Sequence, residues 1–281
     1  MTIVENALDA PRVIAISSGK GGVGKTFFSV HLAAQAAKQG LKVLLLDADL
    51  GLANVDVMLG LSGQGSVKQV VSGEASLKDM LVKAKQGFDV LPGGSGLAEL
   101  TALSGVQQQV LMNEMQDAAK AYDLVLIDTA AGISDNVLFF VASAESTLVV
   151  LTPDPTSLTD AYALIKVLSQ QRDVRRFMVT INQADKVDGE LTFRRLLSVS
   201  DRYLDVHLDY VGHMARHEEV RQAIQKQTLL HHNQAAKDLE KVLQNILNQP
   251  RDTSRSSGLQ FFWQHSLGQG LNVENHEGAW V

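Results

Sequence analysis

Continuous apolar runs that end in polar residues recur along the chain. They read RVIAIS (12–17), KVLLLDAD (42–49), YDLVLIDTAAG (122–132), STLVVLTPD (146–154), RFMVTINQ (176–183) and the shorter DYVGHM (209–214). Runs without alternation suit parallel strands that are covered on both faces. The pattern therefore predicts strands of one parallel sheet.

Between these runs, apolar residues return at the three- to four-residue spacing of helices. Such stretches are 26–40, which ends at Gly40, 158–170 and 218–227. Strands that alternate with helices predict an α/β fold, with a doubly wound, mainly parallel sheet and helices on both faces. Ligands of such sheets bind beyond the carboxyl ends of the strands.

The composition changes at about Gln249, where NQPRDTSRSSG (248–258) is rich in Pro, Ser and Arg. We therefore predict a main domain at 1–248, a linker at 249–258 and a C-terminal tail at 259–281.

Charge and composition exclude several classes of function. The net charge of −6 makes duplex DNA an unfavourable electrostatic partner, so we expect no direct contact with nucleic acid. The absence of cysteine excludes disulfides, zinc–thiolate sites and iron–sulfur clusters. No apolar run reaches the ~18 residues of a spanning helix, and the N-terminus lacks the pattern of an export signal. We expect a cytoplasmic protein.

The segment GKGGVGKT, Gly19 to Thr26, fits the phosphate-loop pattern G-x-x-x-x-G-K-[ST] between a predicted strand and a predicted helix. Such a loop directs backbone N–H groups and a helix N-terminus at an anion. We expect ATP or ADP there, with Lys25 on the β- and γ-phosphates and Thr26 on Mg²⁺. The predicted nucleotide contacts are Gly19, Lys20, Gly21, Gly22, Val23, Gly24, Lys25, Thr26 and Phe27.

Carboxylates close two of the other predicted strands. Asp47 and Asp49 end one strand, and Asp128 ends another in the Walker B position. Carboxylates at neighbouring strand ends can hold Mg²⁺ or orient the attacking water. Alternatively, one of the pair Asp47 and Asp49 only caps the next segment, because Asp is a strong capping residue.

A second lysine, Lys20, is not required by the phosphate-loop pattern. With it, KGGVGKT (20–26) resembles the deviant Walker A motif of the MinD/ParA-like ATPases. The resemblance implies that the early lysine reaches the phosphates of a partner across an ATP-dependent homodimer, much as an arginine finger does. From the residues alone, Lys20 is equally a solvated loop lysine.

The resemblance continues over roughly residues 12–230. LLLDADLGLANVDVMLGL (44–61) is similar to the first switch region, which implies that Asp49 positions water and that Asp47 lies on the Mg²⁺ side. LIDTAAGISDNV (126–137) is similar to the second switch, with Asp128 as its acid. Together with DPTSLTDAYALIK (154–166), these segments most resemble the flagellar-number regulators of the FleN/FlhG type.

That branch implies an ATPase, slow and modulated by partners, that restrains an enhancer-binding flagellar transcription activator. It also implies a signal-recognition-particle-type flagellar GTPase as a second partner, although MTIVENALDAPR (1–12) lacks the segment that acts on this GTPase in some members. The alternatives are a division-site or cargo-positioning and partitioning ATPase of the same superfamily, and a nucleotide-binding adaptor with negligible hydrolysis.

Asn182 matches the position where the family places an asparagine against adenine, which an amide can recognise by its N6/N7 edge. A turn asparagine with local backbone bonds is the alternative. NQAD (182–185) is close to a guanine motif, so GTP stays open. The family's usual proline after the later strand is absent, because Met214 and Ala215 stand there.

The tail contains a short amphipathic segment, 259–267, with Leu259, Phe262, Trp263 and Leu267 on one helical face. No Lys or Arg occurs from Ser256 onward, whereas interfacial helices carry them on the polar face. Three interpretations stay open: the tail folds onto the ATPase body, makes a weak, nucleotide-gated contact at the inner membrane face or cell pole, or docks a partner protein.

Overall fold

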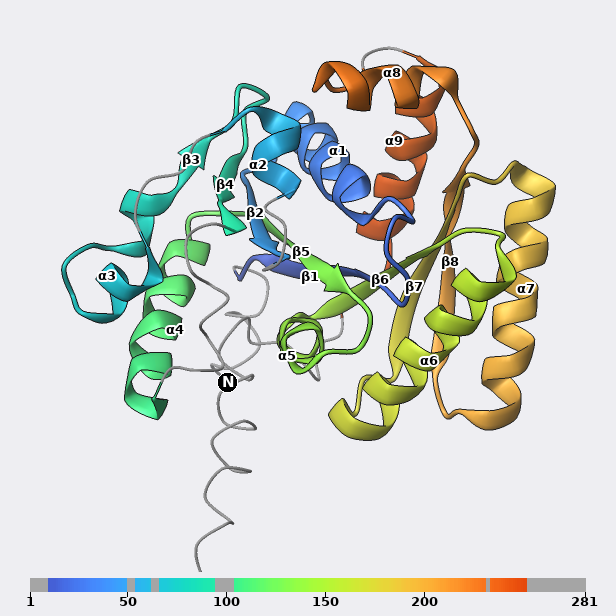
Figure 1. Cartoon of the computed structure of the whole chain (residues 1–281), viewed down its shortest axis with the longest axis horizontal. Helices are drawn as coiled ribbons and strands as arrows, with labels where there is room; N and C mark the ends of the chain where they lie inside the picture. The colour runs from blue at the N-terminus through green and yellow to red at the C-terminus, as the bar shows by residue number, and fades with distance from the viewer. Residues whose placement is uncertain (1–9, 50–53, 62–65, 94–103, 231–232, 252–281) are drawn as a thin grey trace, which may run out of the picture.

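One sheet organises the chain. The computed structural model describes residues 10–49, 54–61, 66–93, 104–230 and 233–251, and within them eight strands follow the order β3-β4-β2-β5-β1-β6-β7-β8 (Figure 1). Neighbouring strands are parallel except β3, which pairs antiparallel with β4. The strands are β1 (Arg12–Ser18), β2 (Val43–Ala48), β3 (Val82–Lys83), β4 (Asp89–Leu91), β5 (Leu124–Ala131), β6 (Ser146–Leu151), β7 (Arg176–Asn182) and β8 (His207–Met214). This order confirms the predicted fold class and all six predicted strands.

Helices cover both faces of the sheet (Figure 1). One face carries α1 (Lys25–Lys38), α2 (Asn54–Leu59), α8 (Glu218–Lys226) and α9 (Gln234–Leu247). The other carries α3 (Val67–Val71), a 3-10 turn (Leu77–Met80), α4 (Gly105–Ala119), α5 (Asp135–Ser143), α6 (Pro155–Arg172) and α7 (Lys186–Tyr203).

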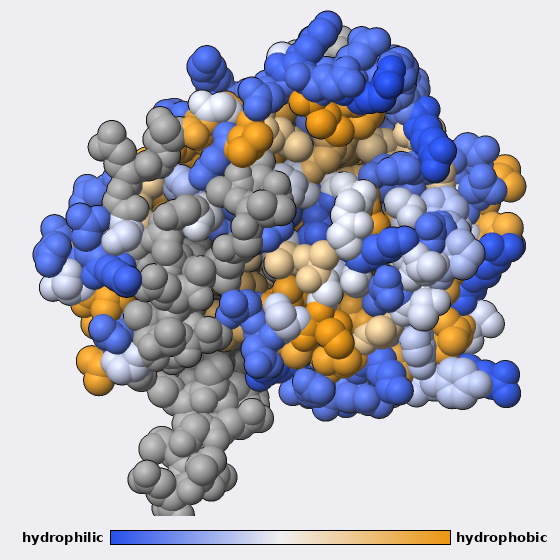
Figure 2. All heavy atoms as spheres, in the orientation of Figure 1, coloured by the Kyte–Doolittle hydropathy of each residue, from blue (hydrophilic) through white to orange (hydrophobic). Residues whose placement is uncertain are grey.

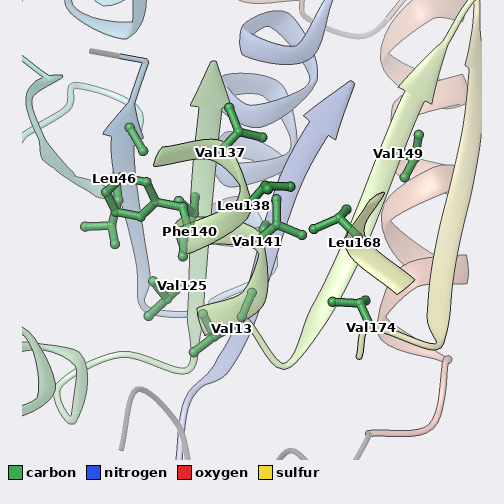
Figure 3. Packing of buried hydrophobic residues seen from close by; sticks show 14 of the residues in the cluster. Val13, Leu46, Val125, Val137, Leu138, Phe140, Val141, Val149, Leu168 and Val174 are labelled. Carbon is green, nitrogen blue, oxygen red and sulfur yellow. The ribbon is translucent and has the colours of Figure 1, made fainter. Parts of the chain in front are cut away.

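The central strand β1 shows why the apolar runs are continuous. Val13 and Ala15 point into the cluster on the α5 and α6 side, whereas Ile14 and Ile16 point into the cluster on the α1 and α9 side. Successive side chains of a strand alternate between faces, so a sheet with two covers needs apolar residues at every position. Figure 3 shows the first of these clusters, in which α5 packs over β1, β2 and β5.

The hydropathy of the surface differs between α8 and α5, which cover opposite faces of the sheet. Figure 2 shows mainly hydrophilic residues over α8 and hydrophobic residues where α5 lies. Consistently, Phe139 of α5 is only partly buried, and Ile133, shortly before α5, is 48% exposed. None of the helices described above combines the length and apolar character needed to span a bilayer.

A partly buried ion pair, in which Glu145 is the buried member, holds the end of the described chain near the amino ends of the central strands. The guanidinium of Arg251 donates to Glu145 at 2.8 and 3.2 Å and to the carbonyl groups of Ala10 and Pro11. Arg12 is also buried nearby, and its pKa is lowered by desolvation although Glu145 opposes the shift. The first residues of the predicted linker thus contact the body, and the remainder of the linker and tail, 252–281, lies outside the described residues.

Replacing the buried Glu145 should lower the stability of the fold. Glu145→Gln leaves the cations of Arg12 and Arg251 without their counter-charge, so the free energy of unfolding should fall by about 3 kcal/mol. Urea denaturation measures this fall. Glu218→Gln, which breaks an exposed pair with Arg221, is the control and should cost under ~0.5 kcal/mol. Equal, small losses in the two variants would contradict the account.

Candidate functional site

The carboxyl ends of β1, β2 and β5 meet at one edge of the sheet and bring the predicted acids together. Asp47 of β2 and Asp128 of β5 are direct neighbours in the parallel register, and both are fully buried. Asp49 follows β2 and is half-buried. The phosphate loop leaves the end of β1 beside them.

The phosphate loop spans residues 19–24 and leads directly into α1. Gly24 has a φ of 101°, a left-handed conformation that favours glycine. Helix α1 has no side-chain cap at its N-terminus and no acidic residue in its first turn. Its first N–H groups and its positive dipole end are therefore available to an anion.

Phe27 lies in the first turn of α1, but its side chain is buried and stacks on His31 with ring centroids 4.0 Å apart. The predicted contact of Phe27 with the nucleotide can therefore involve only its backbone N–H, because the ring is buried in the core.

Lys25 begins α1 and is buried next to the acids. Desolvation lowers the pKa of its ammonium group, and the charges of Asp128 and Asp49 oppose this shift. Asp128 and Asp49 are thus the countercharges of Lys25, and the three predicted residues form one charge cluster.

Asp128 has a raised pKa of about 6, mainly because burial disfavours its charge, while hydrogen bonds from Thr26 and Ser29 lower it. The Ser29 hydroxyl donates to Oδ1 of Asp128 at 2.9 Å. Ser29 was not predicted, although it lies one helical turn after Lys25 and so faces the same side. Oδ2 of Asp128 has no hydrogen-bond partner among the described residues.

This orphaned oxygen and the Thr26 hydroxyl form an all-oxygen donor set of the kind that Mg²⁺ prefers. The residues present therefore fit the predicted metal, with Asp128 and Thr26 as the groups that would hold it.

Both carboxylate oxygens of Asp47 accept hydrogen bonds from backbone N–H groups of the segment that follows β2. Oδ1 accepts from the N–H of Asp49 at 3.1 Å, and Oδ2 accepts from the N–H of Val55 at 3.3 Å. Burial, and secondly the charge of Asp128, raise the pKa of Asp47 to about 7. The structure thus places Asp47 as a support of the first switch segment, as the capping alternative had it. Its contact with Mg²⁺ stays a prediction.

Lys20 contacts its own chain in the structure. Its ammonium group donates to Oδ2 of Asp154 at 3.4 Å and to the hydroxyl of Thr156, both at the start of α6. The Lys20 side chain is 39% exposed and that of Asp154 is 47% exposed. The action of Lys20 on a partner's phosphates stays a prediction.

Asn182 is buried at the end of β7 and holds the phosphate loop. Its Nδ2 donates to the carbonyl of Val23 at 2.7 Å, and its Oδ1 accepts from the N–H of Gln183 at 2.8 Å. A Cβ at Gly24 would collide with the Asn182 amide. Asn182 is therefore in place to position the loop, and its contact with adenine stays a prediction.

A cavity of about 790 Å³ opens beside the loop, which is within the range of nucleotide-sized ligands. Besides loop residues 20–23, the ends of β6, β7 and β8 contribute its walls, of which the sequence analysis had considered only NQAD (182–185) and Ala215, for the choice of base. These lining residues are Thr152, Pro153, Asp154, Gln183, Asp185, Asp188, Ala215 and Arg216. For the others, the only signal in the sequence was their place after three predicted strands.

Comparisons with known proteins agree with this architecture. Residues 11–181 match a family described as the AAA domain. The chain is 41% identical to the antiactivator FleN of Pseudomonas aeruginosa, over 89% of this chain and 91% of FleN. It is 35% identical to the flagellum site-determining protein YlxH of Helicobacter pylori, over 72% of this chain and 68% of YlxH. The structure of a MinC:MinD cell division protein complex from Aquifex aeolicus matches with a TM-score of 0.66 at 27% identity, over 85% of this chain and 97% of that one.

The buried acids should make stability depend on pH. Because the folded-state pKa values of Asp47 and Asp128 are raised above 3.8, the native state binds more protons than the unfolded state up to about pH 7. Unfolding free energy should therefore fall as pH rises from 5 to 8. A pKa raised from 3.8 to about 6 corresponds to about 3 kcal/mol, so the free energy of unfolding of Asp128→Asn should exceed that of the wild type by about 3 kcal/mol at pH 8 without nucleotide or Mg²⁺, and by roughly half of that at pH 5. Urea titrations at both pH values measure this, and a variant less stable than the wild type at pH 8 would contradict it.

Removing the hydrogen bond by which Asn182 holds the phosphate loop should lower the affinity for nucleotides whatever their base. Asn182→Ala loses the bond to Val23, so the affinities for ATP and GTP should both fall, by about tenfold for a hydrogen bond worth ~1.4 kcal/mol. Titration calorimetry with each nucleotide measures the two losses. A loss confined to ATP would instead assign Asn182 to the base.

Proposed function

The chain belongs to the MinD/ParA-like family of AAA-domain ATPases, in the branch of flagellar-number regulators, and on this premise we propose that it restrains a flagellar transcription activator as an ATP-dependent dimer. The similarity to the antiactivator FleN over nine-tenths of both chains carries this proposal. The partner is an enhancer-binding flagellar transcription activator, and a signal-recognition-particle-type GTPase is a second partner.

The proposed reaction is hydrolysis of ATP to ADP and phosphate. The loop N–H groups and Lys25 bind the phosphates, and Asp49 orients the attacking water from the half-buried position after β2. When bound, Mg²⁺ neutralises charge on the phosphate oxygens. Thr26 and Asp128 would hold it. Hydrolysis is slow until a partner completes the site.

The dimer depends on Lys20. An ammonium group that reaches the phosphates of a second copy stabilises charge there and couples assembly to bound ATP. Its half-exposed side chain at the rim of the cavity supports this role, because a fully buried lysine would not reach another molecule. Hydrolysis removes the γ-phosphate and ends the dimer. We place the protein in the cytoplasm, and the tail folds onto the ATPase body, contacts the inner membrane or pole, or docks a partner protein.

Solution mass tests this switch. With a non-hydrolysable ATP analogue and Mg²⁺, light scattering should show twice the mass found with ADP, and Lys20→Ala should stay monomeric while still binding the analogue. Lys38→Ala, at the exposed end of α1, is the matched control and should dimerise normally. A wild type whose mass never changes, or a Lys20→Ala variant that doubles, would overturn the proposal.

A further inference from the structure

A second cavity lies on the α1 and α9 side of the sheet. Its volume is about 520 Å³, and its walls come from the second half of α1, the start of α9, residues 229–230 and the turn between β3 and β4. Helices α1 and α9 lie side by side there (Figure 1). Among the described residues, none lines both this cavity and the one beside the phosphate loop. A cavity of this size accepts a small organic ligand.

The buried side chain of His31 holds one wall of this cavity in place. Its Nδ1 lies 2.8 Å from the carbonyl of Phe27, which can only accept, so Nδ1 carries the ring proton. The other ring nitrogen, Nε2, accepts from the N–H of Leu230 at 3.2 Å. This bond fastens residues 229–230 to α1, and both leucines are buried. The wall is therefore preformed, and its apolar side chains can pack on the body of a ligand.

The lining carries an excess of positive charge. Lys38 ends α1, Lys85 lies in the turn between β3 and β4, and Lys237 lies in the first turn of α9. Within the described part of the chain, their ammonium groups form no ion pair and no hydrogen bond. Glu240 is the one acid that lines the cavity in that part of the chain, although the whole protein has a net charge of −6. The three cations therefore attract an anion to this point of an acidic molecule.

The position of Lys237 is not explained by the stability of α9. The positive end of the helix dipole disfavours a cation in the first turn, and α9 has no acid there to offset it. An anion in the cavity offsets this unfavourable charge. Lys85 is presented by a short turn, which is closed by a hydrogen bond from the N–H of Gly87 to the carbonyl of Ala84 at 3.0 Å.

We propose that this cavity is a second ligand site, which binds a small phosphorylated molecule. A phosphate ester or diphosphate carries two or more negative charges and matches the three ammonium groups, since lysine binds phosphate as a point charge. The amides of Gln35 and Gln86 also line the cavity and supply donors for the phosphate oxygens. The apolar part of the ligand packs on Leu229 and Leu230. This site does not depend on the proposed dimer, and it leaves the phosphate loop free for ATP.

A titration of the whole chain with inorganic pyrophosphate, without Mg²⁺ and followed by methyl NMR, tests the site. The methyl signals of Ala34, Leu229, Leu230 and Ala236, which line the cavity, should shift and saturate with a dissociation constant of about 1 mM or less. Pyrophosphate also has access to the phosphate loop, and the methyl signals of Val23 report that binding separately in the same spectra.

Charge reversal identifies the groups that bind. Lys85→Glu and Lys237→Glu should each raise the dissociation constant read from the cavity methyls by about tenfold, because attraction to the anion becomes repulsion. The Val23 signals should respond as in the wild type. Both lysines are exposed, and Glu suits the first turn of α9, so the fold should be retained. Lys241→Glu, about one helical turn further along α9 and outside the cavity, is the matched control and should bind as the wild type does.

Saturating shifts at the cavity methyls that are weakened in both variants and retained in Lys241→Glu support the site. The site is overturned if these signals do not saturate, if Lys85→Glu and Lys237→Glu bind pyrophosphate as tightly as the wild type, or if the control loses as much affinity as they do. These signals are read whether or not the protein dimerises with ATP, so neither result bears on the proposed function.

Discussion

Two like charges are buried side by side at the centre of the sheet, and the site is arranged around them. The parallel register of β2 and β5 makes Asp47 and Asp128 neighbours, and both side chains are fully buried. The chain compensates with the ammonium of Lys25, the hydroxyl of Ser29, two backbone N–H groups of the first switch segment and raised carboxyl pKa values. A divalent cation is the further compensation that this cluster favours, and the phosphates that accompany it meet the loop N–H groups.

The phosphate loop is held from two sides by elements far away in sequence. Asn182 of β7 binds the carbonyl of Val23, and α6 packs on Gly19 while its first turn binds Lys20. The loop is therefore in direct contact with the β6–β8 half of the sheet. This half also supplies most of the cavity beside the loop.

The strands and the phosphate loop were predictable because they depend on local pattern. The strands that are covered on both faces are mainly apolar without alternation, and the loop motif lies between a strand and a helix. The short strands β3 and β4 were not named, because two or three residues carry no periodicity. The contact of Ser29 with Asp128 and the contact of Lys20 with Asp154 depend on register and packing between distant segments, which no local pattern in a single sequence encodes. For Asn182, the sequence suggested a base contact, whereas the fold adds the bond to the loop.

The central claim is that Lys20 acts on a nucleotide bound to another copy, and a mixing experiment tests it most directly. Lys20→Ala and Asp49→Ala should each lack ATPase activity. In a mixed dimer, the site on the Lys20→Ala subunit has its own Asp49 and receives Lys20 from its partner, so phosphate release should reappear when the two inactive proteins are combined. If Lys20 serves the nucleotide of its own chain, no subunit in the mixture has a complete site, and the absence of any recovered activity would contradict the account.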